Sequence, residues 1–347
     1  MSADFMNGGR RALKELYLSY GYSYYKLPGF EEYSLYAENR TFLQSADVIA
    51  FNAGGKLLAL RPDVTLSVLK NARPDGGTQK LFYDEKVYRR SASGPFAETD
   101  QIGVEVIGEV DAVTEAEVLE LMLGTLARVS DNYVLDISHV GVIEKLLDAM
   151  RLSGEDRAFA TACLAGKNVH DFKKFRAERS LSESAADAFE TLITLPAETQ
   201  SAFAKLKKID GCVFEEIEEL RALAAHGGDR VNVNFSVIGD PEYYNGAVFR
   251  GYVEGVPNAV LSGGRYDGLA EKFGKSYKAV GFALYLGELR LNTSSNAPDT
   301  VLIYGIDGKA ALQKAAELRK SGRRVLLAKE LPANFSGEVI YAEGKND

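Results

Sequence analysis

Residues 80–109, KLFYDEKVYRRSASGPFAETDQIGVEVIGE, carry the pattern that decides the fold. Polar and apolar side chains alternate through 80–91 and, more regularly, through 100–109. In the second run the apolar face consists of Ile102, Val104 and Val106, and the opposite face of Gln101, Gly103 and Glu105. The side chains of a strand point alternately to its two faces, so both runs are expected to be strands. A short loop with Gly94 and Pro95 joins them, which predicts an antiparallel pair.

The rest of the chain shows further strand patterns on either side of one long helical segment. Apolar residues have helical spacing at 10–20, 64–72 and 114–129. Residues 152–228 are rich in Ala, Glu and Lys and predict a helical insertion. Strand patterns then resume at 230–238, 246–255 and 258–264. This order predicts an α+β fold, an antiparallel sheet flanked by helices, rather than a doubly wound parallel sheet.

Local signals predict where some of these elements begin and end. Gly21 is expected to close the first helix, and Thr114 with Glu117 has the spacing of a capping box. SGGRYDG at 262–268 follows antiparallel strands and lacks the G-x-G-x-x-G spacing, so it does not predict a dinucleotide site. Residues 1–293 are expected to form one domain that contains the insertion. SSNAPD at 294–299 is typical of a linker, and 298–347 predict a small α/β unit.

Composition narrows the classes of function. The formal net charge of −8 and the absence of a dense Lys/Arg block disfavour nucleic acid as a partner. Cys163 and Cys212 are the only cysteines and form no CxxC pair, so we expect reduced thiols in the cytoplasm and no metal site. The N-terminal stretch has no long apolar run, and no segment is apolar over the roughly 18 residues that a membrane span needs. Neither a signal peptide nor a membrane partner is expected.

Several polar side chains are expected to face inward and to form a pocket. Asp63 and Thr65 are expected at a strand-to-helix turn, and Asp63, Gln101 and Glu105 are acceptors that suit an ammonium group. Arg89 suits a carboxylate, and Tyr243 and Tyr244 suit a flat ring. Together they predict a site for a small zwitterion, an amino acid.

Each of these residues also has a purely structural interpretation. Asp63 and Thr65 have the pattern of residues that start a helix, and the tyrosine pair is compatible with core packing. Gln101 and Glu105 are compatible with the wet face of a half-exposed strand. Arg265 and Asp267 are compatible with residues that only hold the SGGRYDG turn together. The three histidines, His139, His170 and His226, fall outside every motif and are not expected to be catalytic.

A set of ordered motifs resembles one family. These are LALRPDVT (58–65), VYRR (87–90), QIGVEVIGE (101–109), PEYYNGAVF (241–249), SGGRYDGL (262–269) and AVGFAL (279–284). In this order they resemble the catalytic domain of class II histidyl-tRNA synthetases over roughly residues 1–290. The resemblance implies an antiparallel sheet flanked by helices, with Leu27 and Pro28 near a dimer interface. It also implies a histidine pocket made of Asp63, Thr65, Arg89, Gln101, Glu105, Tyr243, Tyr244 and Tyr266.

The cations that this family uses for adenylation are not matched. The family's arginine before the tyrosine pair corresponds to Gly239, and the second motif-2 arginine corresponds to Ala97. The motif-3 arginine corresponds to Glu288, an acid where a phosphate would need the opposite charge. Fixed cations stabilise the charge that develops on the phosphates, so their loss predicts a site that recognises an amino acid without activating it. The tail resembles only the front half of an anticodon-binding domain.

A synthetase-like chain without these features resembles the regulatory subunits of ATP phosphoribosyltransferase. That resemblance implies a non-catalytic subunit without a cofactor, required by the short-form catalytic subunit at the first step of histidine biosynthesis. It further implies a hetero-octamer of four regulatory and four catalytic chains, self-association as a dimer, and free histidine as the effector. Two alternatives stay open: a divergent histidyl-tRNA synthetase that forms histidyl-adenylate, and a stand-alone amino-acid-binding protein.

Overall fold

The computed structural model describes residues 8–40, 43, 48–74, 77–90, 94–209, 211–290, 300–305, 308–332, 335 and 337–342. Its contacts divide the chain into two compact units. One unit is Gly9–Leu291, and the other is Asn292–Asp347 together with Met1–Gly8. Within the described part, no helix combines the length and the apolar character that a membrane crossing requires.

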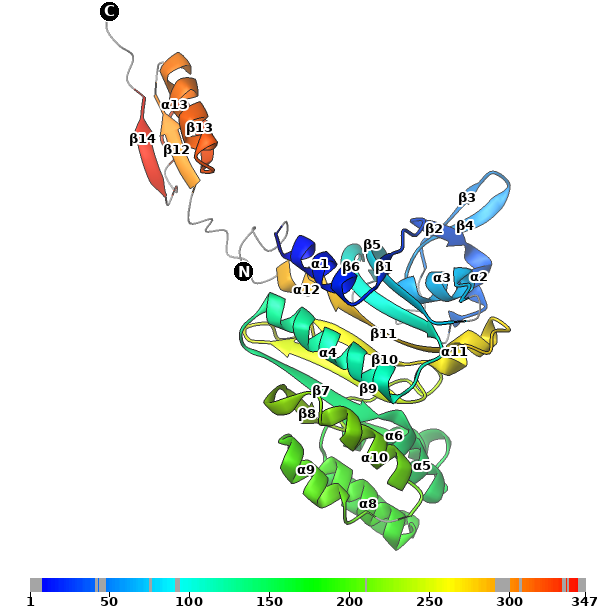
Figure 1. The fold of residues 1–347 in the computed structure, drawn as a ribbon. Coiled ribbons are helices and arrows are strands. Elements are labelled where there is room, and N and C mark those ends of the chain that lie inside the picture. Colours follow the sequence, from blue (N-terminus) through cyan, green and yellow to red (C-terminus); the bar gives the residue numbers. More distant parts are fainter. Residues whose placement is uncertain are drawn as a thin grey trace, which may run out of the picture. The chain divides into compact units, whose positions relative to one another are not determined.

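An eight-stranded sheet is the frame of the larger unit (Figure 1). In spatial order its strands are β1 (Ser23–Tyr24), β5 (Gln79–Arg90), β6 (Phe96–Gly108), β11 (Lys278–Tyr285), β10 (Leu261–Arg265), β9 (Ala247–Val253), β7 (Tyr133–His139) and β8 (Val231–Val233). The pairs from β5 to β7 are all antiparallel, which confirms the predicted fold class. The two edge pairs, β1 with β5 and β7 with β8, are parallel. The sheet is therefore antiparallel in its centre and parallel at both edges.

The alternation in 100–109 decides what each face of this sheet contacts. Val104 pairs with Phe82 on one side and Phe282 on the other, and both rings pack against Tyr17 of α1 (Arg10–Ser19). Helix α4 (Ala112–Val129) packs beside α1 against the same sheet. Gln101 and Glu105 belong to the opposite face, yet each is only 2% exposed. Both faces of the strand are thus covered, and a wet strand face is excluded.

The second face is covered by elements from distant parts of the chain. A small three-stranded sheet has the order β2 (Phe30–Glu32), β4 (Lys56–Leu60) and β3 (Ala50–Ala53). It is accompanied by α2 (Tyr33–Ala37), α3 (Val64–Asn71) and α11 (Asp267–Lys272). Their apolar residues form one core with Leu81, Tyr83 and Tyr266.

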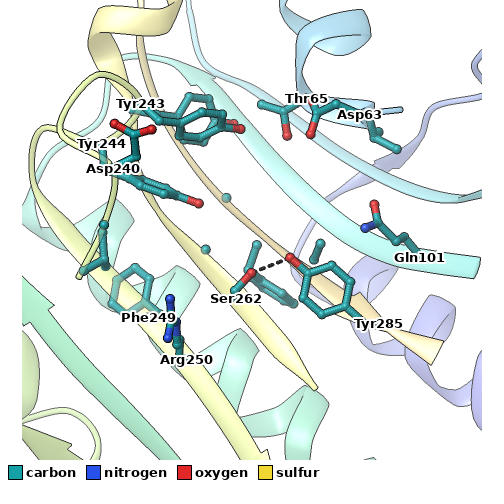
Figure 2. A pocket seen from close by; sticks show the side chains of 18 of the residues that line it. Asp63, Thr65, Gln101, Asp240, Tyr243, Tyr244, Phe249, Arg250, Ser262 and Tyr285 are labelled. Atoms are coloured by element: carbon teal, nitrogen blue, oxygen red, sulfur yellow. Dashed lines mark hydrogen bonds between the residues drawn. The ribbon is translucent and has the colours of Figure 1, made fainter. Parts of the chain in front are cut away.

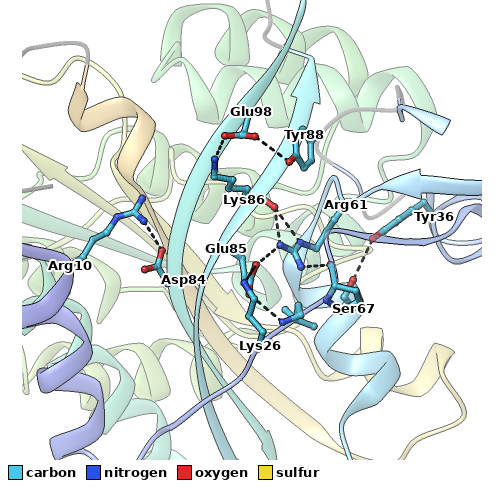
Figure 3. A network of polar contacts seen from close by, with 12 residues as sticks. Arg10, Lys26, Tyr36, Arg61, Ser67, Asp84, Glu85, Lys86, Tyr88 and Glu98 are labelled. Atoms are coloured by element: carbon cyan, nitrogen blue, oxygen red, sulfur yellow. Dashed lines mark hydrogen bonds and ion pairs between the residues drawn. The ribbon is translucent and has the colours of Figure 1, made fainter. Parts of the chain in front are cut away.

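A buried ion pair fixes the small sheet to the large one (Figure 3). Arg61, just after β4, places Nη2 at 2.8 Å from Oε2 of Glu85 on β5, and both side chains are almost fully buried. Arg61 Nη1 also donates to the carbonyl of Pro28 at 2.6 Å. The second oxygen of Glu85 accepts from the backbone N–H of Leu27 at 3.2 Å. Arg61 therefore sets the position of the chain that leads to Asp63.

The insertion consists of short helices at the β7 and β8 end of the sheet (Figure 1). They are α5 (Val140–Ala149), α6 (Gly154–Ala165), α7 (Val169–Arg179), α8 (Glu183–Ile193), α9 (Thr199–Leu206), α10 (Phe214–Ala224) and the 3₁₀ turn η3 (Gly228–Arg230). This helical crossover allows β7 and β8 to run parallel, because a parallel pair needs a long connection. The last element of the larger unit is α12 (Leu286–Arg290).

The C-terminal unit is a parallel sheet with one helix. Its strands have the order β13 (Arg324–Ala328), β12 (Thr300–Tyr304) and β14 (Glu338–Tyr341). Helix α13 (Gly308–Lys320) supplies Ala311 and Ala315 to a core that also contains Val301 and Ile303. The unit thus has an apolar core of its own.

Candidate ligand-binding site

A pocket of about 310 Å³ lies on the sheet face opposite α1 and α4. The strands β6, β9, β10 and β11 form its floor, and the start of α3 and the loop at 237–244 form its walls. Figure 2 shows Asp63 and Thr65 on one wall and Tyr243 and Tyr244 on the other. All eight predicted residues are in its lining: Asp63, Thr65, Arg89, Gln101, Glu105, Tyr243, Tyr244 and Tyr266. The structure therefore brings together residues that are up to 203 positions apart, from 63 to 266.

Glycines in the strands leave the space that these side chains occupy. A Cβ on Gly281 would collide with the carboxylate of Glu105, its partner in the β6–β11 register. A Cβ on Gly264 would lie 2.6 Å from the ring of Tyr244. Because such distances are far below van der Waals contact, larger residues at these two positions would displace pocket side chains. The glycine-rich strands are thus part of the site.

Glu105 is the most buried acid of the pocket. Its Oε1 accepts a hydrogen bond of 2.7 Å from Thr65 Oγ1, and its Oε2 accepts one from the hydroxyl of Tyr266. Burial raises the pKa of Glu105 to about 8, although both hydrogen bonds act in the opposite direction. A carboxyl group with this pKa is mostly protonated in the empty pocket at neutral pH. It can lose its proton when a cationic or N–H donor group arrives.

Asp63 has two roles at once. As the N-cap of α3 it accepts a hydrogen bond of 2.9 Å from the backbone N–H of Leu66. Its other oxygen lies 3.5 Å from Nη2 of Arg89. Burial raises the pKa of Asp63, while the charge of Arg89 lowers it. The helix-start interpretation of Asp63 is therefore correct, and the residue lines the pocket as well.

The aromatic wall comes from a turn and a strand end. The backbone N–H groups of Tyr243 and Tyr244 both bond to the carbonyl of Asp240, at 3.0 and 2.8 Å. The rings of Tyr243 and Tyr244 are 4.5 Å apart, and Tyr243 is 5.7 Å from the ring of Tyr266. Tilted aromatic pairs at such distances stabilise each other and offer a flat, partly polar surface. This wall suits a planar heterocycle.

The positions expected to have lost arginines do not all border the pocket. Gly239 lines it, and a Cβ there would lie 2.7 Å from Cγ1 of Val248 and 2.9 Å from Cγ2 of Val140. Ala97 and Glu288 are not among the described residues of the lining, and Glu288 accepts a hydrogen bond of 3.0 Å from Asn258. Glu288 lies on α12, the short helix beyond β11. That it takes the place of a phosphate-facing arginine stays a prediction.

The charged residues of the SGGRYDG turn have a structural role. Arg265 contacts Asp267 at 2.9 Å and Glu115 of α4 at 2.7 Å, and it is outside the described pocket lining. Tyr266, between them in sequence, lines the pocket, as do Ser262 and Gly263 at the start of the motif. The structural interpretation of Arg265 is thus supported.

Sequence reasoning missed Asp240, at the exposed rim of the lining. It also missed three polar residues of the strands: Arg250, Ser262 and Tyr285. They belong to β9, β10 and β11, and Ser262 shares a hydrogen bond with the hydroxyl of Tyr285 (Figure 2). The period of two in 246–255 places Arg250 on the same face as Val248, so an alternation count there would have found it.

Comparison with known proteins shows the family to which this chain belongs. A sequence model described as "Histidyl-tRNA synthetase" matches residues 1–289. The chain is also 30% identical, over 333 residues, to an ATP phosphoribosyltransferase regulatory subunit of Ralstonia nicotianae, with coverage of 91% of this chain and 85% of that protein. The chain belongs to the family of ATP phosphoribosyltransferase regulatory subunits, which are related to histidyl-tRNA synthetases. A regulatory subunit of Oceanobacillus iheyensis is 24% identical over 336 residues, with coverage of 91% and 83%.

Solved structures show that the chain also resembles members of this family in its fold. A structure from Bacillus halodurans, titled as an ATP phosphoribosyltransferase regulatory subunit/histidyl-tRNA synthetase, has a TM-score of 0.75 at 25% identity. It covers 96% of this chain, and this chain covers 93% of it. The ATP phosphoribosyl transferase (HisG:HisZ) complex from Thermotoga maritima matches with a TM-score of 0.64 at 20% identity, over 82% of this chain and 97% of that one. The latter likeness supports the fold.

Proposed function

We propose that this chain is the histidine-sensing regulatory subunit of a short-form ATP phosphoribosyltransferase. In this role it binds free histidine, does not activate it, and is required for the activity of the catalytic chain. Membership of the regulatory-subunit family and the name of the Thermotoga maritima complex support the partner. The pairing of four regulatory with four catalytic chains, and a dimer that uses the turn at Leu27 and Pro28, belong to the same proposal.

The observation that carries the proposal is the environment of Glu105. A buried carboxyl group held by Thr65 and Tyr266 lies beside a wall of tyrosine rings. An imidazole has a flat ring for the wall and an N–H group for the carboxylate, and the α-amino group suits Asp63. Position 239, where the family has an arginine, holds a glycine, and the neighbouring side chains leave no space for a larger residue. This position therefore supplies no cation to stabilise a phosphate.

The first experiment measures ligand binding to the isolated chain. Calorimetric titration with L-histidine is expected to show binding, whereas titration with magnesium ATP is expected to show none. Glu105→Ala should weaken histidine binding by about 1–3 kcal/mol, because a buried charge-assisted hydrogen bond is lost. Glu98→Ala is the matched control, since Glu98 is an exposed acid of the same strand, and its affinity for histidine should be unchanged.

The second experiment tests the partner and the alternatives. A short-form catalytic chain should co-purify with this chain and gain activity from it, and added histidine should lower that activity. No co-purification would favour a stand-alone amino-acid-binding protein. Histidine-dependent exchange of pyrophosphate into ATP would favour the divergent synthetase instead, and it would contradict the proposed role.

A further inference from the structure

Arg250 occupies the end of the pocket away from the predicted ammonium site. It is directly opposite Ser262 in the β9–β10 register, and Ser262 is opposite Ala283 of β11. The next residue on the same face of β11 is Tyr285, which is opposite Gln101 of β6. Figure 2 shows the same sequence of side chains, with Arg250 and Gln101 on either side of the Ser262–Tyr285 hydrogen bond. A charged group therefore borders a floor of small and hydroxyl-bearing side chains.

Within the described part of the chain, Arg250 has no hydrogen bond or ion pair, and the acids near it have other partners. Asp136 is directly opposite Arg250 on β7, but its oxygens accept from the amides of Asn232 and Asn234, at 3.3 and 2.7 Å. Asp240, at the exposed rim, accepts from the backbone N–H of Glu242 at 2.9 Å. The guanidinium of Arg250 is thus available to a ligand.

The charges of the other pocket residues largely cancel. Arg89 is 3.5 Å from Asp63, and its Nε donates to the carbonyl of Pro62 at 2.6 Å, so its charge is offset by its own neighbours. Glu105 is mostly protonated at neutral pH because burial raises its pKa to about 8. Among the described residues of the lining, Arg250 and Asp240 at the rim are then the charges without an oppositely charged partner, and an anion placed beside Arg250 gains a charge-assisted hydrogen bond.

No larger side chain fits at position 239 without displacing its neighbours, so a cation in this part of the pocket must come from another residue, such as Arg250. Val248 fills the space that a side chain at 239 would need. Val248 and Arg250 are on the same face of β9, two residues apart, so the strand that blocks one position supplies a cation at the next. Burial raises the pKa of Tyr244, and the charge of Arg250 acts against this rise, which places that charge near the aromatic wall.

We propose that Arg250 binds an oxyanion in this pocket, assisted by the hydroxyl groups of Ser262 and Tyr285. The oxyanion is the carboxylate of the bound amino acid or a phosphate on a second small ligand. This inference rests on the proposed function for the first source only. Arg250 thereby takes over the anchoring that the blocked position at Gly239 cannot provide.

The test compares wild type with two variants. Arg250→Met keeps most of the length of the side chain but removes its charge, and Arg250→Lys keeps the charge. Each is titrated with L-histidine, with histidinol, which lacks the carboxylate, and with inorganic phosphate. Arg11→Met is the control, because it removes the same charge from an exposed site. Melting curves establish that each variant is folded. If Arg250→Met is not folded, the comparison of wild type with Arg250→Lys is the test.

If the carboxylate is the anion, Arg250→Met lowers histidine affinity about ten- to a hundredfold and leaves histidinol affinity unchanged, while Arg250→Lys recovers part of the loss. If the anion belongs to a second ligand, phosphate binds wild type and not Arg250→Met, while histidine affinity is the same in both. Equal binding of histidine and phosphate to wild type and variant overturns the inference. So does an equal loss of histidine and histidinol, which indicates a structural role. A wild type that does not bind histidine contradicts the proposed function, and the phosphate titration then decides the inference alone.

Discussion

A single buried carboxyl group, that of Glu105, sets the chemistry at the residue scale. The fold holds its pKa at about 8, mainly through burial. Since this value is above that of the unfolded chain, the contribution of Glu105 to stability is present in acid and is lost as the pH rises through 8. A ligand group that bonds to the carboxylate recovers part of this energy. The empty pocket is therefore poised to bind a donor and to release a proton.

Histidine binding is expected to depend on pH for this reason. Below pH 8 the protonated form of Glu105 competes with the ligand, so affinity falls by up to about tenfold for each unit of pH. Titrations at pH 7 in two buffers with different heats of ionisation measure the protons released, and wild type should release close to one. Glu105→Gln, which cannot ionise, should release none. Equal release by both proteins would mean that another group titrates.

The site was predictable from sequence wherever a residue type at a strand or helix end points to one chemistry. Asp63 was found in this way, Glu105 by the alternation within its strand and Tyr266 by the family resemblance, and the structure places each of them in the lining. Arg250 escaped because an arginine inside an apolar strand gives no motif. Glu288 was matched to a phosphate-facing arginine by a linear comparison alone, and it lies outside the described lining of this pocket.

At the scale of elements, α4 illustrates how far a local signal reaches. The spacing of Thr114 and Glu117 predicts a helix that begins at 114, but the helix begins at Ala112. Asp111 is the N-cap, and it accepts from the backbone N–H and the hydroxyl of Thr114, both at 2.8 Å. An aspartate is at least as good a cap as a threonine, so two capping signals three residues apart compete. The existence of the helix was predictable, and its first turn was not.

The pair of Arg61 and Glu85 controls how the small sheet joins the large one. Arg61→Met should lower the free energy of unfolding by about 3–5 kcal/mol, because it leaves the carboxylate of Glu85 buried without its main partner. The double variant Arg61→Met/Glu85→Leu should recover most of that loss. Urea denaturation measures both, with Lys56→Met, which breaks an exposed pair with Glu32, as a control that should change little. A single variant as stable as wild type would show that the network is dispensable.

At the scale of the whole molecule, the sequence indicates a sheet and an insertion but not the partner surface. The parallel pairing of β7 and β8 requires a long connection, which the crossover through α5–α10 supplies. Regulation of a partner needs two states of an assembly that differ in affinity for the ligand. One chain and one pocket define where the ligand acts, and the coupling is a property of the complex.

This coupling can be measured in two directions that must agree. If histidine weakens the productive assembly of this chain with its catalytic partner by a certain factor, the partner must weaken histidine binding by the same factor. A tenfold effect corresponds to about 1.4 kcal/mol in each direction. One measurement gives the dissociation constant of histidine for the chain alone and for the chain in the complex. The other gives the dissociation constant of the two subunits with and without saturating histidine. In Glu105→Ala a higher concentration of histidine should be needed for the same effect on assembly, in proportion to the loss of affinity, whereas Glu98→Ala should equal wild type. A complex that responds to histidine while its histidine affinity equals that of the free chain would place the sensor outside this pocket.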